Sequence, residues 1–92
     1  MKIKELFSDS SKWTKGACAK TKHYTACLPT NPSAVCWCLA GALRKCYGES
    51  GESMSKIRLR ILRSLGADYI VWNDDPTRTF EEVKALVEEL DI

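Results

Sequence analysis

Five cysteines and one histidine are the side chains of this 92-residue chain best suited to covalent chemistry. Nucleophilic catalysis needs a thiolate, a base within reach and a group that orients the base. Cys36 or Cys38 could supply the thiolate and His23 the base, with Asn73 or Asp74 as the orienting group. Their order and spacing match no familiar thiol hydrolase, and a buried free cysteine commonly acts as a small apolar residue. We therefore predict no catalytic residue, with a thiol-dependent enzyme as the alternative.

The same side chains could also hold a metal ion. Four zinc ligands could be drawn from a set of five residues: Cys18, His23, Cys27, Cys36 and Cys38. Structural zinc sites usually show two pairs of ligands at Cys-x₂₋₄-Cys spacing. Here the closest pair is Cys-x-Cys, inside a segment with a helical pattern. We predict no metal and no other cofactor.

Length, composition and the N-terminal segment narrow the class of protein. The chain is one domain, residues 1–92, with 45% hydrophobic and 28% charged residues, as in ordinary globular domains. No apolar run approaches the ~20 residues that cross a bilayer, and the first residues lack the apolar core of a secretion signal. We expect a cytoplasmic protein with reduced thiols and no membrane partner.

Charge is unevenly distributed along the chain. Residues 1–63 carry a net charge of +8 and residues 64–92 a net charge of −6. Lys56, Arg60 and Arg63 share one side of an expected helix and could touch phosphates. No nucleic-acid-binding module surrounds them, so nucleic acid is an unlikely partner, and an internal match between the basic and acidic parts is the favoured explanation.

Hydrophobic periodicity predicts an α+β fold that is mainly α. Its centre is an apolar, cysteine-rich helix that opens at Asn31-Pro32, a cap signal, and ends at Gly48. Two further main helices, at 53–65 and 79–90, enclose it, and the last begins with a Thr79/Glu82 capping box. A short helix at 2–8, a loop with a hairpin at 13–30 and a strand at 69–72 complete the prediction.

Three motifs occur in a recognisable order: Trp13-x-x-Gly16-Ala17, then Cys38-Leu39-Ala40-Gly41-Ala42-Leu43, then Trp72-Asn73-Asp74 with Arg78 shortly after. In this order the chain resembles a family of small, uncharacterised bacterial and phage proteins with a Cys-x-x-Gly-Ala-Leu helix and a later Trp-Asn-Asp segment. The resemblance supplies no activity. It implies an intact small domain and draws attention to Cys38, Gly41, Asn73, Asp74 and Arg78.

We predict a non-enzymatic binding protein that engages a protein partner or a small ligand through the 13–30 loop and the 72–78 turn. Occurrence of the similar family in phage implies an inhibitor of a host protein or a sequestering protein as two forms of this role. Asn and Asp at such a turn also cap helices and bond their own backbone, which is the structural explanation for them. The predicted contact residues are Trp13, His23, Trp72, Asn73, Asp74 and Arg78.

Overall fold

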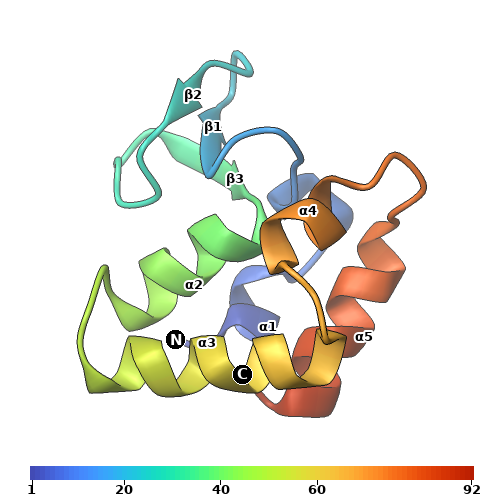
Figure 1. Cartoon of the computed structure of the whole chain (residues 1–92). Helices are drawn as coiled ribbons and strands as arrows, with labels where there is room; N and C mark the ends of the chain where they lie inside the picture. The colour runs from blue at the N-terminus through green and yellow to red at the C-terminus, as the bar shows by residue number, and fades with distance from the viewer.

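Most of the molecule is helical, and one small sheet lies at the N-terminal end of the central helix (Figure 1). The computed structural model describes residues 1–92. The α+β, mainly α fold class is confirmed. The elements in chain order are α1 (Ile3–Leu6), the 3₁₀ turn η1 (Ser10–Lys12), β1 (Ala19–Thr21), β2 (Ala26–Cys27), β3 (Ala34–Trp37), α2 (Leu39–Tyr47), α3 (Glu52–Leu65), α4 (Tyr69–Asp74) and α5 (Phe80–Leu90).

The N-cap of the central helix lies seven residues after the predicted Asn31 cap, so this prediction was wrong at its N-terminal end. Residues 34–37 form strand β3, and α2 starts at Leu39 with Cys38 as its N-cap. Asn31 closes a turn instead, because its side chain accepts a hydrogen bond from the Ser33 N–H at 2.8 Å. Asn-Pro favours a turn as well as a helix start. The predicted end at Gly48 is confirmed, and its φ of +91° suits glycine.

The sheet has the strand order β2-β1-β3, and both strand pairs are antiparallel. β1 and β2 form the hairpin expected within the 13–30 loop. The β1–β3 register slips by one residue, since Lys20 faces Cys36 whereas Thr21 faces Ala34. Val35 is therefore the extra residue of a β-bulge, a feature that redirects a side chain.

Residues 69–72 are helical, so the predicted strand was wrong. Asp68 caps α4 by accepting hydrogen bonds from the backbone N–H groups of Ile70 at 2.8 Å and Val71 at 3.3 Å. The helix turns Ile70 and Val71 toward solvent and Trp72 toward the core. Capping and packing together outweigh the β-propensity of this aromatic and β-branched run.

The two remaining long helices follow their predicted bounds closely. α3 ends at Gly66 in the left-handed conformation, and α5 begins with the Thr79/Glu82 capping box. α2 contacts α1, α3 and α4, whereas α5 packs mainly against α1. The fully buried core joins these helices through Ile3, Phe7, Leu39, Leu43, Ile61, Val83, Val87 and Ile92. None of the helices combines the length and the apolar character needed to span a membrane.

Candidate functional site

Asn73 links three segments that are far apart in the sequence. Its side-chain oxygen accepts hydrogen bonds from the Trp13 indole N–H at 2.7 Å and the Leu39 backbone N–H at 3.0 Å. Its amide group donates to the Thr14 carbonyl at 3.2 Å and to the Asp74 carboxylate at 2.9 Å. The residue is 0% exposed. Asn73 therefore holds the Trp13 segment against the start of α2, and its side chain does not reach the surface.

Asp74 and Asp75 fix the same segment from the other side. The Asp74 carboxylate accepts a hydrogen bond from the Gly16 N–H at 3.1 Å, and the Lys15 ammonium donates to the Asp75 carbonyl at 2.7 Å. The Asp75 carboxylate bonds the backbone N–H and the hydroxyl of Thr77, and these two bonds lower its pKa. The end of α4 is thus a clamp on residues 13–16.

Trp72 and Arg78 bind to each other. The Arg78 guanidinium lies 4.0 Å from the centre of the Trp72 ring and donates to the Trp72 carbonyl at 2.9 Å. It also forms an ion pair with the Glu82 carboxylate at 2.8 Å, and the Arg78 side chain is only 16% exposed. Both side chains therefore stabilise the turn between α4 and α5 (cation–π contacts of this kind contribute about 0.5–2 kcal/mol).

The Cys-x-x-Gly motif joins β1 to α2. The Cys38 sulfur accepts a hydrogen bond from the Gly41 N–H at 3.3 Å, and burial raises the pKa of this thiol to about 11. Gly41 packs directly on the backbone of Cys18, because a Cβ at position 41 would lie 1.7 Å from the Cys18 carbonyl oxygen. These two positions of the motif therefore serve a cap and a close backbone approach.

The thiols and the histidine are not joined to each other by hydrogen bonds. Cys36 is buried and its Sγ donates to the Lys20 carbonyl at 3.9 Å. His23 is exposed at the hairpin tip, and no hydrogen bond connects it with Cys36 or Cys38. All five cysteines are free thiols, and no three His, Cys, Asp or Glu side chains gather as metal ligands.

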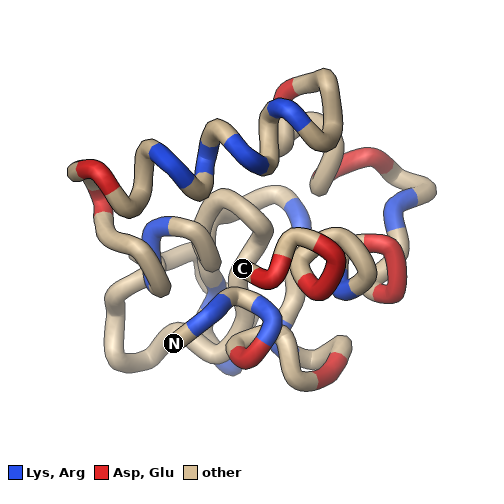
Figure 2. Tube along the Cα trace, turned by 90° about the horizontal axis from the view of Figure 1, so that it is seen from below, with Lys and Arg blue, Asp and Glu red and all other residues tan.

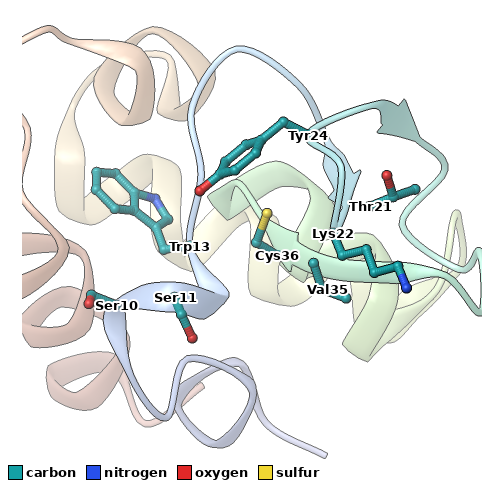
Figure 3. Close-up of a pocket in the computed structure, with 8 residues that line it drawn as sticks. All are labelled: Ser10, Ser11, Trp13, Thr21, Lys22, Tyr24, Val35 and Cys36. Carbon is teal, nitrogen blue, oxygen red and sulfur yellow. The ribbon is translucent and has the colours of Figure 1, made fainter.

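A groove runs along the β1–β2 hairpin beside β3. It comprises a hollow of about 160 Å³ between η1 and the hairpin and a hollow of about 400 Å³ between the hairpin and residues 32–35, and the two share Thr21, Lys22 and Val35. In the smaller hollow the Tyr24 hydroxyl points toward Trp13, and the Cys36 sulfur lies beside Tyr24 on the side away from Trp13 (Figure 3). His23 lines the larger hollow. The groove therefore unites two predicted contact residues, Trp13 and His23.

Tyr24 is the residue of this groove that sequence reasoning missed. It is 78% exposed, and its φ of +60° lies in the left-handed region. Two turn hydrogen bonds hold it there, from the Tyr24 N–H to the Thr21 carbonyl and from the Thr21 N–H to the Thr25 carbonyl. Three-residue hairpin loops usually carry glycine at such a position. A loop without Gly or Asn between two strands was the signal that could have identified it.

A third hollow, of about 210 Å³, lies where residues 16–18 meet the start of α2 and α4. Asp74 lies at this hollow beside the exposed Ile70 of α4. Its remaining lining is small and mostly apolar, and consists of Gly16, Ala17, Cys18, Cys38 and Ala40.

Comparison with known proteins identifies the family. Residues 2–90 match a family of unknown function, DUF6197. No curated protein and no solved structure matches the chain. The match covers almost the whole chain, including Asn73 with its hydrogen-bond partners and the contact of Gly41 with Cys18. The chain therefore belongs to the DUF6197 family.

Proposed function

We propose that this chain is a non-enzymatic binding protein of the cytoplasm, and that the groove along the β1–β2 hairpin is its contact surface. The occupant would be a segment of a protein partner or a small ligand. An inhibitor of a phage-host protein and a sequestering protein are two forms that this role could take.

Tyr24 is the observation that carries the proposal. A bulky side chain in the left-handed region costs about 1–2 kcal/mol relative to a residue that fits there. Here that conformation presents an aromatic ring to solvent, where it buries little surface of its own. The ring makes one cation–π contact, with the Lys20 ammonium 5.9 Å from its centre, so the strained conformation contributes little packing to the fold. Strain with so little packing in return is typical of functional positions.

The chemistry of the groove suits an apolar or aromatic group with an acidic neighbour. Trp13 and Tyr24 provide flat apolar walls, and such side chains dominate the energetics of many interfaces. Lys22 supplies a positive charge at the junction of the two hollows, and Ser10 and Ser11 supply hydroxyl groups at one end. An aromatic residue of a partner protein, flanked by Asp or Glu, would meet all three features.

In this proposal the 72–78 turn holds the Trp13–Gly16 segment, which forms part of the groove, in place. Asn73 fixes the indole of Trp13, and Asp74 fixes Gly16. In this proposal the two residues set the position of one wall of the groove. Direct contact of Trp72, Asp74 or Arg78 with a partner stays a prediction.

Native mass spectrometry of the tagged chain, purified from the cells that encode it, tests the proposal. We expect a bound protein or small molecule on the wild type, and its loss from the Tyr24→Gly variant. Tyr24→Phe keeps the ring and should keep the bound species.

Leu59→Ala is the matched control, because Leu59 is also an exposed apolar residue (45%) but lies on α3. This variant should retain the bound species. Equal binding by all four proteins would refute the groove as the contact surface. Rapid iodoacetamide labelling of Cys36 alone near neutral pH would instead support the thiol-enzyme alternative.

A further inference from the structure

Cys18 and Cys38 face each other at the end of the β1–β3 ladder. Ala19 pairs with Trp37 in this ladder, so the next position outward in register brings Cys18 opposite Cys38. The Cys38 N–H donates to the Cys18 carbonyl at 3.1 Å, which extends the ladder to this pair. Directly opposed residues of an antiparallel pair project their side chains from the same face.

The Cα spacing of such a pair suits a disulfide, whereas its Cβ atoms, about 5.5 Å apart in a hydrogen-bonded pair, must approach to about 4.5 Å or less before the bond closes. Opposed residues at a hydrogen-bonded position have Cα atoms about 5.5 Å apart. Disulfides join residues whose Cα atoms are roughly 4.4–6.8 Å apart. Both cysteines also line the same hollow of about 210 Å³, next to Gly16 and Asp74.

The other three thiols are held elsewhere. Cys36 lies opposite Lys20, donates to the Lys20 carbonyl and lines the groove, not the hollow of Cys18 and Cys38. Cys27 is on β2, and Cys46 lies in the last turn of α2. The Cys18–Cys38 pair is thus the one that the strand register places face to face.

We propose that Cys18 and Cys38 are a redox pair that closes to a disulfide when the protein meets a low-molecular-weight disulfide such as oxidised glutathione. The pair is reduced in this structure, so the proposal concerns a second, oxidised form of the protein.

Exchange would begin at Cys18. This thiol is only partly buried, and the Arg44 guanidinium lies 3.4 Å from its sulfur, whereas Cys38 is buried. The Cys18 thiolate attacks one sulfur of oxidised glutathione, forms a mixed disulfide and releases one glutathione thiolate. Cys38 then loses its proton, attacks the Cys18 sulfur and expels the second glutathione. Two protein thiols are oxidised and one glutathione disulfide is reduced to two thiols.

Closure would lock the segment before β1 onto the first turn of α2. That segment carries Trp13 and Gly16, the residues held by Asn73 and Asp74. A disulfide between Cys18 and Cys38 would therefore restrain one wall of the proposed groove and one wall of the hollow of about 210 Å³ that both cysteines line.

Intact-mass analysis of the full chain after treatment with oxidised glutathione tests the proposal. Wild type should lose about 2 Da, the mass of the two hydrogens removed. Non-reducing peptide mapping with the free thiols blocked should join the peptide containing Cys18 to the one containing Cys38. Cys38→Ser should not lose this mass and should keep one glutathione on Cys18, since closure is no longer possible.

Cys36→Ser is the matched control, because Cys36 is also buried and lies on β3, two residues before Cys38. It should close like the wild type. Serine is a good N-cap, so Cys38→Ser should keep the start of α2 folded, which circular dichroism will verify. A link at Cys36, closure in Cys38→Ser, or a wild type that remains at its reduced mass or carries only glutathione would overturn the proposal.

Discussion

At the tip of the β1–β2 hairpin, a tyrosine occupies a backbone conformation that glycine adopts without strain. Tyr24→Gly should relieve about 1–2 kcal/mol of strain while losing about 0.5–1 kcal/mol to the greater freedom of the unfolded chain. We expect a free energy of unfolding, measured by urea titration, that is unchanged or higher by up to about 1.5 kcal/mol. A decrease of more than about 1 kcal/mol would mean that Tyr24 is retained for stability.

Asn73 shows how far individual residues can be interpreted from sequence. The sequence and the family resemblance both draw attention to it, and the structure shows that it is important to the fold. Its two hydrogen-bond donors, Trp13 and Leu39, lie 60 and 34 residues away in the chain. No local sequence pattern reveals partners so far away. An asparagine that binds a partner at the surface and a buried asparagine that links distant segments therefore look the same in the sequence.

At the scale of elements, the helices with strong termini were predictable. The Thr79/Glu82 box and the glycines at 48 and 66 mark their helix ends as expected. The errors fell on segments whose local preference is ambiguous. Val35 and Trp37 suit a strand as well as an apolar helix, and strand pairing with β1 decides between them.

The contact between α2 and β1 allows a sharp test at this scale. Gly41→Ala places a Cβ against the Cys18 backbone, and no flexible side chain there can move aside. Despite the better helix propensity of alanine, the free energy of unfolding should fall by about 3 kcal/mol or more.

Ser64→Ala on the exposed side of α3 serves as the control and should change stability by less than about 0.5 kcal/mol. A Gly41→Ala protein as stable as this control in thermal and urea unfolding would contradict the close approach of α2 and β1.

At the scale of the whole molecule, residues 1–63 are net positive and residues 64–92 net negative. Contacts between the two ends of the chain bring some of these opposite charges together. Basic residues, mostly arginines, lie along α3, and acidic residues lie along α5 (Figure 2). Arg60 of α3 donates to the Leu90 carbonyl at the end of α5. Lys2 and Lys4 pair with Asp91 at 2.8 Å and 2.6 Å. No ion pair joins an acidic side chain of α5 to a basic side chain of α3.

The ion pairs of Asp91 with Lys2 and Lys4 make the stability of the fold depend on pH. Hydrogen bonds from Lys2 and Lys4 lower the pKa of Asp91 to about 2, below its value of 3.8 in an unfolded chain. A lowered pKa means that the stabilisation is complete above about pH 4 and disappears as the pH falls toward 2. Asp91→Asn should therefore be less stable than wild type at pH 7, and the two proteins should converge near pH 2.

Asparagine tolerates the left-handed backbone of position 91, so this variant isolates the charge. Urea titrations across this pH range measure the difference, which should shrink in high salt because the pairs are exposed. A stability difference that is constant from pH 7 to pH 2 would show that the ion pairs contribute nothing.

The proposed groove is tested most directly by a photo-crosslink from its exposed wall. With p-benzoylphenylalanine in place of Tyr24, irradiation of the cells that encode the protein should attach one defined protein or small molecule at position 24. The same group at position 59 on α3 should not yield that adduct. No adduct from position 24, or identical adducts from positions 24 and 59, would contradict a binding function for this groove.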